Sequence, residues 1–596
     1  MTVIELSKTI LTSLLTMFLV STLLASGCRM TWAADPATLY VPSEYPTIQE
    51  AINHANPGDT VFVHNRTYYE NIVINKSVSL VGEDRDSTII DGQEAGTVIS
   101  VTTNGVTISG FTIQKSTQGL YNSGIYIDHS SNNSITHNSI EANYHGIYLL
   151  SSNNNDITNN RVTANNFHGI YLVDSMDNVL SGNNASFNVN DGISLHSSHG
   201  NTISYNNASS NQNDGIYLYS SNDNIITQNE VASNSYHGVH FHSSSDNVIS
   251  NNHAVFNENN GVYLDHSVNN VIFDCELSRN TLHGIYVFLS NNNYIFSNNI
   301  SKNEYGVRLY SFSSNNTFYH NNFLQNKNQV WSESANEWND AIGGNYWSDY
   351  TGQDLDRDGL GDTPYVIDAN NRDPYPLMGV FRVFTVIWKE RAYGVNIVSN
   401  SQIALFGFAA EAQTGNKMVS FTVTGEEGAL GFCRVMVPTD LTPYSLFVLV
   451  DGEEVPTIPL EVPEASFIGA SFTYLQGDHS VTIVASKLLH LYNQLLAEYS
   501  GLQTDYGNLT SAYHELLVGY AQLLAGYGAM NTSLQSLLQA HSEIEAEYAA
   551  LLSVHSQNIQ SLVYIFLATT VIFVVTTVYL SIHAHTKAPK TKESQA

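Results

Sequence analysis

The sequence predicts an all-β protein whose main domain is a parallel β-helix, a solenoid in which short parallel strands stack turn upon turn. The first observation is a 23-residue repeat that is written eight times between Gly124 and Asn303. The second is the alternation of residues after the glycine of each repeat, and the third is a set of asparagines in step with the period. A fixed period of this size is typical of solenoids, in which each repeat buries its apolar face only against its neighbours.

Short strands rather than helices make up each repeat. In one clear copy Ile147 and Leu149 would face one way, and Tyr148 and Leu150 the other, which is the period of a strand. No copy holds the roughly ten residues of amphipathic spacing that a helix needs, so helical-repeat solenoids are excluded. The repeat therefore predicts regular β-helix coils over residues 124–325.

Asparagines occupy three columns of the repeat, which begin at Asn133, Asn138 and Asn143. The second column is broken once, by Cys275. Asparagine tolerates the left-handed backbone of a tight corner, and its amide can bond the same amide one turn away. We therefore interpret these residues as corners of the coil and not as a binding code.

The composition argues against a nucleic-acid partner. The chain has 596 residues and a formal charge of −32, whereas phosphate binding needs clustered Lys and Arg. The three cysteines, Cys28, Cys275 and Cys433, provide neither a disulfide framework nor a thiolate metal cluster.

The chain before the repeats predicts a secretory signal and a cap. Residues 1–33 combine a lysine, an apolar run and small residues, as a signal peptide does, with lipidation at Cys28 as the alternative. Residues 34–123 predict irregular first coils closed by a short helix that carries Ile48 and Ile52. A β-helix needs such a plug because its first coil would otherwise expose apolar core and an unpaired strand edge.

Residues 326–380 predict a C-terminal cap that contains an acidic loop. Its three tryptophans suit a cover over the last turn. The loop has the spacing of a calcium loop, and it predicts one structural Ca²⁺ bound by Asp354, Asp356, Asp358, Leu360 (through its carbonyl) and Asp362. Position 12 is Tyr365 instead of the bidentate glutamate, so an acidic turn without an ion is the alternative.

Three further segments follow the cap. Short β-rich runs over 381–486 predict a β-sandwich. From 487 to 560, Tyr and Leu recur every seven residues, which predicts a coiled-coil stalk that forms a homo-oligomer, with a helix folded back on the sandwich as the alternative. Residues 562–582 are apolar and uncharged, which predicts a single transmembrane helix. The lysines of the tail, 583–596, would place it in the cytoplasm and the large N-terminal part outside the cell.

Residues 40–377 resemble the NosD-like right-handed parallel β-helix proteins of cell surfaces, which share the carbohydrate-binding and sugar-hydrolysis repeat. The resemblance rests on TIQEAINHANPGDTVFVHN, on the GIYL-x-x-S-x-x-N-x-I repeats, and on GGNYWSDYTG followed by DRDGLGDTPYVI. It implies the right-handed fold and, because many members are archaeal, an archaeal source. The same coil serves pectin-cleaving enzymes, epimerases, metal-delivery proteins and adhesins, so no catalytic residue is carried over.

Side chains that point outward from the coils are the candidate functional residues. Seven of them, two positions after the glycines, form an aromatic ladder that suits glycan binding, because rings pack on sugars while polar groups bond their hydroxyls. They are Tyr126, Tyr148, Tyr171, Tyr217, His240, Tyr263 and Tyr286.

Two sharper sites lie on the same coils. Asp191 and Asp214 should lie one turn apart, and a carboxylate pair at about that spacing can serve catalysis. An alternative metal set for copper or zinc, less favoured because its reach across two turns is uneven, comprises His237, His240, His242 and Asp265. An exposed polar ladder without specific chemistry is the simplest alternative to both.

Three functions are compatible with these features. The favoured one is a membrane-anchored cell-surface protein whose β-helix binds polysaccharide or other surface glycans. The second is an extracellular polysaccharide lyase, hydrolase or epimerase that uses Asp191 and Asp214. The third is a metal-delivery protein.

Overall fold

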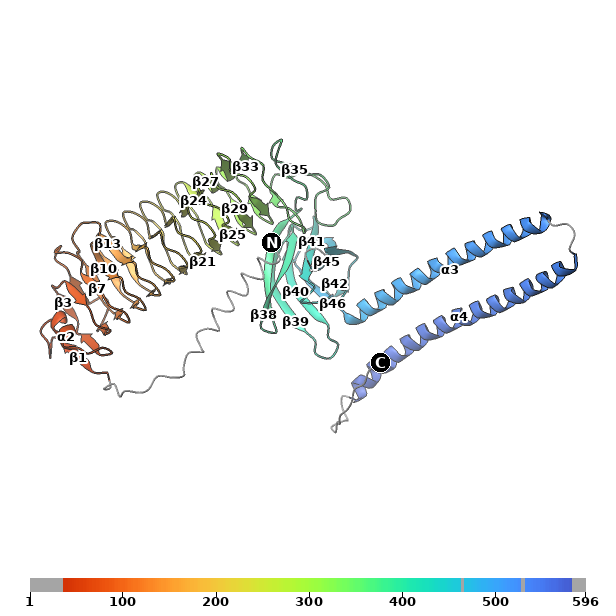
Figure 1. Cartoon of the computed structure of the whole chain (residues 1–596), viewed down its shortest axis with the longest axis horizontal. Helices are drawn as coiled ribbons and strands as arrows, with labels where there is room; N and C mark the ends of the chain where they lie inside the picture. Colours follow the sequence, from red (N-terminus) through yellow and green to blue (C-terminus); the bar gives the residue numbers. More distant parts are fainter. Residues whose placement is uncertain (1–35, 463–465, 527–530, 581–596) are drawn as a thin grey trace. The chain divides into compact units, whose positions relative to one another are not determined.

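The computed structural model describes residues 36–462, 466–526 and 531–580, and the chain divides into two compact units after Leu491 (Figure 1). The predicted signal peptide and C-terminal tail lie outside the described residues. The first unit holds a right-handed parallel β-helix of about 13 turns followed by a β-sandwich, which confirms the predicted solenoid and sandwich.

The first face of the β-helix is a 13-stranded parallel sheet, to which each turn gives one short strand. In spatial order its strands are β1 (Thr38–Val41), β2 (Thr60–Val63), β5 (Ser79–Gly82), β8 (Thr107–Ser109), β11 (Ser134–Thr136), β14 (Asp156–Thr158), β17 (Val179–Ser181), β19 (Thr202–Ser204), β21 (Ile225–Thr227), β23 (Val248–Ser250), β25 (Val271–Phe273), β28 (Tyr294–Phe296) and β31 (Thr317–Tyr319).

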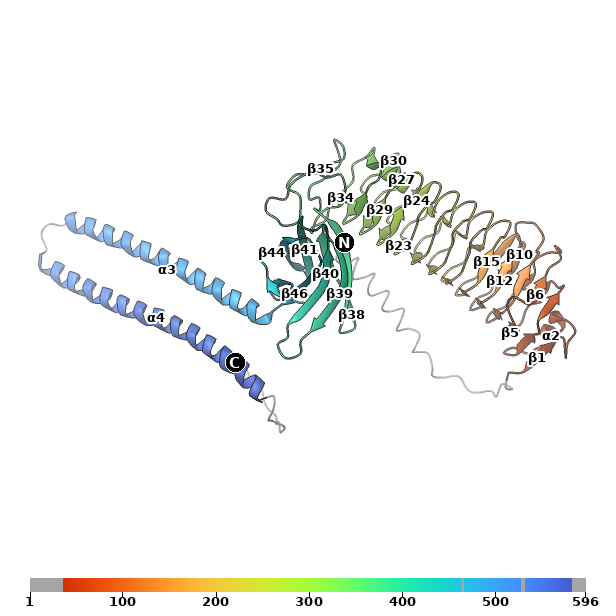
Figure 2. The same ribbon diagram turned by 180° about the vertical axis from the view of Figure 1, so that it is seen from behind.

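The second face is a 12-stranded parallel sheet that carries the outward aromatic column. Figure 2 shows the ribbon of the β-helix from behind. Its strands are β4 (Ile72–Ile74), β7 (Ile99–Val101), β10 (Ser123–Asp128), β13 (His145–Leu150), β16 (Ile170–Val173), β18 (Ile193–His196), β20 (Ile216–Tyr219), β22 (Val239–His242), β24 (Asn260–Asp265), β27 (His283–Phe288), β30 (Tyr305–Tyr310) and β33 (Asn328–Ser332).

The third face is discontinuous. It has a five-stranded sheet and a four-stranded sheet, and single β-bridges from Arg161 to Glu276 join them. The strands are β3 (Arg66–Tyr68), β6 (Thr88–Asp91), β9 (Thr112–Gln114), β12 (Ser139–Glu141), β15 (Arg161–Thr163), then β26 (Glu276–Ser278), β29 (Asn299–Ser301), β32 (Asn322–Leu324) and β34 (Tyr346–Trp347).

Aliphatic side chains from all three faces fill the interior of the coil. Ile193, Leu195 and Ile203 belong to one turn and are each 0% exposed. Burial of such a side chain contributes about 1.5–3 kcal/mol, so the stacked turns stabilise one another chiefly through this core. The repeated glycine, such as Gly215 before β20, is needed because a Cβ there would meet the Gly238 carbonyl oxygen at 2.7 Å.

The asparagine columns are hydrogen-bonded ladders, of which the second is broken at Cys275. Asn206 is 1% exposed; its Oδ1 accepts from the backbone N–H of Asn183 at 2.9 Å and from its Nδ2 at 3.0 Å. The backbone N–H and Nδ2 of Asn206 in turn donate to Oδ1 of Asn229 at 2.9 and 3.1 Å. Side-chain amides thus hold the corners, as interpreted from the repeat.

Both ends of the β-helix are covered. Helix α2 (Ile48–His54) buries Ile48, Ala51 and Ile52 at the first turn. At the other end Trp338 stacks on Phe318 and Trp347 stacks on Phe323, with ring centroids 4.6 and 4.3 Å apart. Both indoles are 1% exposed, so they close the apolar interior against water.

The β-sandwich has two antiparallel five-stranded sheets around a separate apolar core. One sheet is β37 (Val380–Trp388), β38 (Arg391–Ser399), β41 (Leu430–Pro438), β45 (Phe467–Leu475) and β44 (Thr457–Val462). The other is β39 (Gln402–Ala410), β40 (Lys417–Thr424), β46 (His479–Ala485), β42 (Leu446–Val450) and β43 (Glu453–Glu454). A short pair, β35 (Tyr365–Val366) and β36 (Arg372–Asp373), lies in the cap before it.

The second unit consists of two helices, α3 (Lys487–Gly526), which begins in the first unit, and α4 (Asn531–Leu580). The structure does not support the predicted coiled-coil stalk over 487–560, because that segment is divided between α3 and α4. Tyr513 of α3 has its ring centroid 6.2 Å from His541 and 6.0 Å from Tyr548 of α4. Heptad positions therefore meet within one chain.

The apolar stretch predicted as a transmembrane helix, 562–582, belongs mostly to α4, and its last two residues lie outside the described residues. Within the part of the chain that the structure describes, no helix is long and apolar enough to cross a membrane. The structure therefore does not support that prediction.

Candidate functional site

The outward side chains of the second face form an aromatic column. Neighbouring ring centroids are 5.2 Å apart for Tyr126–Tyr148 and 5.0 Å for Tyr148–Tyr171. After one interruption the column continues from Tyr217 to His240, Tyr263 and Tyr286 with spacings of 4.8, 4.7 and 5.0 Å. The structure thus brings together all seven residues predicted for glycan binding.

Most of this column is half-buried, with one exception. Tyr148 is 3% exposed between its two tyrosine neighbours, so it supports them and leaves little surface of its own. The rings stack on one another at interplanar angles of 17° to 23° for three of the pairs, which covers their faces. Sugar contact through ring faces, as predicted from sequence, is therefore limited.

Ser194 interrupts the column between Tyr171 and Tyr217. The register pairs Tyr171 with Ser194 and Ser194 with Tyr217 on consecutive strands. Turns repeat about every 4.8 Å, so the two tyrosines lie roughly two such steps apart. The interruption falls beside Asp191 and Asp214, where the sequence predicts the catalytic pair.

The residues just before the glycines form a second column, which is buried. Asp191 and Asp214 are 1% and 2% exposed, so the simplest alternative, an exposed polar ladder, is wrong here. Oδ1 of Asp191 accepts the backbone N–H of Asp214 at 3.1 Å, and Oδ1 of Asp214 accepts the backbone N–H of His237 at 2.9 Å. Each aspartate thus uses one oxygen as the asparagines do, to bond the next turn.

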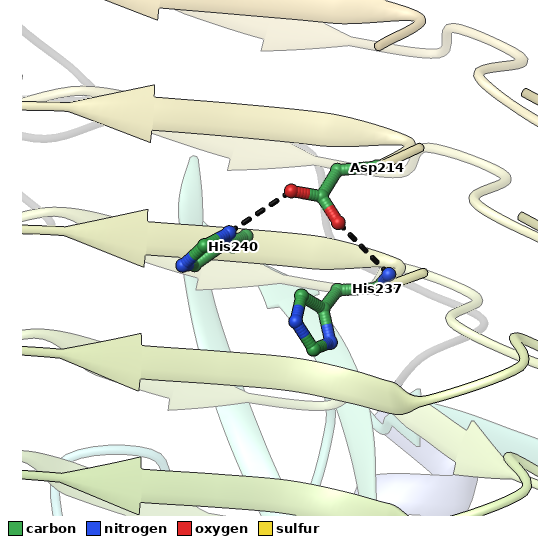
Figure 3. Close-up of side chains that lie close together, drawn as sticks. All are labelled: Asp214, His237 and His240. Atoms are coloured by element: carbon green, nitrogen blue, oxygen red, sulfur yellow. Dashed lines mark hydrogen bonds and ion pairs between the residues drawn. The ribbon is translucent and has the colours of Figure 1, made fainter. Parts of the chain in front are cut away.

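The second oxygen of each aspartate faces a histidine. Oδ2 of Asp214 lies 2.9 Å from Nδ1 of His240, and Figure 3 draws this contact as a dashed line. Oδ2 of Asp191 lies 3.1 Å from Nδ1 of His168, a close ion-pair distance without hydrogen-bond geometry. The site therefore contains two buried carboxylate–histidine pairs on successive turns.

Burial controls the protonation of this cluster. It raises the pKa of Asp214 above its usual range, and the adjacent His240 opposes that shift. It lowers the pKa of His237 to about 3, so His237 is neutral near pH 7. Nδ1 of His237 then accepts from the side-chain amide of Asn260 at 3.1 Å.

A third carboxylate orients two more histidines. Oδ2 of Asp265 lies 2.6 Å from Nδ1 of His242, and its Oδ1 lies 2.6 Å from Nδ1 of His266. Carboxylates that accept a hydrogen bond from the Nδ1–H of a neutral histidine leave its Nε2 free as an acceptor or metal ligand. Nε2 of His240 is buried and has no hydrogen-bond partner among the described residues.

The alternative metal set is therefore divided into two triads that share His240. One is Asp214, His237 and His240, and the other is His240, His242 and Asp265; within each, the ligand atoms lie within 4.8 Å of one another. Imidazole and carboxylate groups in this arrangement fit copper or zinc. Both triads come from strands and corners of neighbouring turns, since β22 carries His240 and His242 on one face.

The acidic loop of the cap brings Asp354, Asp356 and Asp358 within 4.8 Å of one another. Asp354 accepts the backbone N–H groups of Asp358 and Gly359 at 3.1 and 3.0 Å, and burial raises the pKa of Asp354 and Asp358. Oxygen donors of this kind fit Ca²⁺.

Tyr365 and Arg434 are the aromatic and basic neighbours of that loop. Tyr365 at position 12 stacks on Trp347 at 4.3 Å, which places it in the cap. Nη1 of Arg434 donates to the carbonyl of Asp358 at 2.6 Å and lies 3.4 Å from its carboxylate, so a guanidinium already neutralises part of the loop. Calcium binding stays a prediction for Asp354, Asp356, Asp358, Leu360 and Asp362.

Sequence reasoning missed several residues of the site. Asn213 donates to Oδ1 of Asp191 at 2.7 Å, and His266 and Asn260 contact the histidine cluster as described above. Asn213 directly precedes a column residue and His266 directly follows one, while Asn260 takes the place of a histidine within a column. The period alone therefore did not single them out. The neighbouring turn supplies the contact in the case of Asn213 and Asn260.

The fold and the site define a β-helix protein with a polar and aromatic face. The family model described as periplasmic copper-binding protein (NosD) matches residues 52–249 and 232–352, which together cover about half of the chain. The chain belongs to the NosD family, as the resemblance implies, while the archaeal source stays a prediction. Among curated proteins, none matches the chain.

Several solved structures resemble the chain. The A-module of mannuronan C-5 epimerase AlgE6 of Azotobacter vinelandii is 14% identical with a TM-score of 0.45, and the match covers 49% of this chain and 92% of that one. The Dettilon tailspike protein (gp208) is 15% identical with a TM-score of 0.43, over 75% and 94%. The catalytic domain of a GH87 alpha-1,3-glucanase is 16% identical with a TM-score of 0.46, over 54% and 71%. At these identities the likeness concerns the fold alone.

Proposed function

We propose that the protein binds polysaccharide along the outer face of the 12-stranded sheet, from β10 to β27. The observation that carries this proposal is the half-buried aromatic column, which runs along the turns and is interrupted only at Ser194. The half-buried phenol groups of Tyr126, Tyr171, Tyr217, Tyr263 and Tyr286 offer hydrogen-bonding contacts at five turns to a chain of sugar hydroxyls. A polymer fits such a repeating row better than a small molecule does.

The test is the affinity of the full chain for soluble polysaccharides, with and without the column. Tyr217→Ala and Tyr263→Ala should each weaken binding about tenfold, because a truncated aromatic anchor commonly costs somewhat more than 1 kcal/mol. Phe296→Ala is the matched control, since Phe296 stacks between Phe273 and Tyr319 on the 13-stranded sheet. Equal effects of the three variants would contradict the assignment of the face.

Transition-metal binding is the second candidate function. The carboxylate–histidine pairs Asp214–His240 and Asp265–His242 are the specific observation that favours it, because they fix the tautomer that metal ligation needs. Metal analysis after dialysis against copper or zinc should show about one tightly held ion per chain, reduced in His240→Gln and in His242→Gln. His253→Gln, an exposed histidine on the third face, is the control. Retention of metal in both site variants would rule the triads out.

Catalysis by Asp191 and Asp214 is a third proposal. Its support is the raised pKa of Asp214, which suits a general acid, beside a second carboxylate one turn away. The use of Oδ1 of both residues in the ladder weighs against it. A polysaccharide-cleaving activity that survives in Asp191→Asn with Asp214→Asn would dispose of this assignment.

The place where the protein works is also a proposal. We infer export from the cytoplasm, on the strength of the signal pattern in residues 1–33, which lie outside the described residues. Separation of the secreted, surface and cytoplasmic fractions of cells that express the full chain would test this.

A further inference from the structure

We infer that the polysaccharide bound on this face is a polymer of neutral or amino sugars and not a polyuronate or a sulfated glycan. This inference rests on the proposed function and specifies its ligand. It follows from the basic, histidine and acidic side chains that line the second face.

Basic side chains are absent from this face between β10 and β24. From Lys115 to Arg279 the sequence contains one intervening Lys or Arg, Arg161. Arg161 lies in β15 on the third face and pairs with Glu141, and Lys115 pairs with Asp91. Arg308, which follows Tyr286 in the register, supplies a cation at one end only, and there it lies over the ring of Trp331.

Two buried histidines of the face, His145 and His283, do not replace the missing cations. Burial lowers the pKa of His145 to about 3 and that of His283 to about 4, so both are neutral near pH 7. His168 and His240 each face a carboxylate, that of Asp191 at 3.1 Å and that of Asp214 at 2.9 Å.

Three carboxylates of the face are at least partly exposed, and two of them are paired: Asp128 with His129, and Asp265 with His242 and His266. Asp128 has 34% of its side chain exposed, Asp174 is exposed just after β16, and Asp265 is partly exposed in β24. A polyanion laid along the column would therefore meet the like charge of Asp174 and would find no lysine or arginine between β10 and β24 to pair with. A polysaccharide that carries only neutral hydroxyls or ammonium groups meets no such electrostatic repulsion.

The same charges bear on the reaction class. A lyase or an epimerase removes a proton next to a uronate carboxylate, and the charge that develops there needs cationic or hydrogen-bond donors aimed at it. The side chains between β10 and β24 include no lysine or arginine in that role. The lack of these cations favours hydrolysis of a non-acidic glycan among the three enzyme classes considered above.

The test compares four polymers on the full chain at low ionic strength with EDTA present: a soluble neutral glucan, chitosan oligomers, polygalacturonate and alginate. Binding of the glucan or of chitosan at least tenfold tighter than either uronate supports the inference. Binding of a uronate as tight as or tighter than both others overturns it and leaves the proposed function standing. Binding of none of the four removes the proposed function and this inference with it.

A charge variant provides the second arm. Val173 is partly exposed in β16, next to Tyr171 along the outward face. Val173→Lys should strengthen polygalacturonate binding about tenfold in low salt, and added salt should reduce the gain because it screens the new charge. Thr158→Lys, at a partly exposed position on the 13-stranded sheet, is the matched control. No gain in Val173→Lys, or an equal gain in both variants, contradicts the electrostatic basis.

Discussion

At the scale of single residues, position in the repeat decides what a side chain does. Asp191 and Asp214 stand in a buried column and bond the next turn with one oxygen, while the other oxygen faces a histidine. The sequence period located this pair and its spacing correctly. It could not reveal the burial of the pair, because that burial depends on how the adjacent aromatic column packs. The rings of that column contact the buried histidines, His145, His168 and His237 among them.

Acid should destabilise the protein through its buried histidines. His237 has a pKa of about 3 in the folded protein, against 6.5 unfolded, so as pH falls from 6.5 the unfolded state takes up a proton that the folded state refuses. The free energy of unfolding should fall by about 1.4 kcal/mol per pH unit from this residue in that window. His237→Asn, which keeps an acceptor for Asn260, should flatten the slope by that amount in denaturant titrations at pH 7 to 4. His137→Asn, at an exposed corner, should leave the slope unchanged.

At the scale of elements, the β-helix coils could be predicted because each uses the same short strands and the same corner amides. The helices after residue 486 could not be predicted to the same degree. A heptad pattern indicates that helices pack along a seam, but it does not tell whether the partner is another chain or the same one. The contact between Tyr513 and His541 shows that part of the seam is used within the chain.

Repair of the broken asparagine ladder should stabilise the β-helix. Cys275 replaces an asparagine, is 1% exposed, and presents a thiol where the neighbouring turns present an amide. Sulfur is a weak acceptor, so Cys275→Asn should raise the free energy of unfolding by about 1 kcal/mol. The reverse change in an intact turn of the same column, Asn206→Cys, should lower it by about 1–3 kcal/mol. Stability shifts of the same sign in both variants would contradict the ladder account.

Leucines left exposed on the two helices favour the proposed homo-oligomer. Leu516 and Leu551 are 72% and 71% exposed. If a second copy covers them, light scattering of the full chain should give a mass above that of one chain, and Leu516→Glu should reduce it. Glu515→Gln, at the adjacent position, is the control. A single-chain mass at all concentrations tested would rule the proposal out.

At the scale of the whole molecule, the β-helix and the β-sandwich are joined by a small apolar cluster around Leu377, Phe381 and Val398 and by polar contacts that no periodic pattern could indicate. Arg434 of β41 donates to the carbonyls of Asp358 and Ile342, and Ser471 of β45 donates to the carbonyl of Arg357. Asn322 exchanges two hydrogen bonds with the backbone of Phe381. These residues are far apart in sequence and belong to no repeat, which is why the sequence predicts the two domains but not their joint.

Loss of Arg434 should weaken that joint. The residue is 4% exposed, so Arg434→Met removes a buried cation and leaves two carbonyls without this donor, at a cost of about 3 kcal/mol. Calorimetry should then show the sandwich unfolding earlier, as a separate transition from the β-helix. Arg382→Met, a half-buried arginine within the sandwich that donates to Ile403, should leave the two transitions as they are in the native protein. Identical traces for both variants would show that Arg434 does not couple the domains.

The hydrogen bonds of the asparagine ladders bear on how the sequence of such a protein can evolve. They join residues 22 or 23 apart, so each turn contacts only the turns directly before and after it. An in-frame duplication or deletion of one whole repeat would leave every remaining contact intact. The length of the β-helix can therefore change through the number of repeats alone, without a substitution at any position.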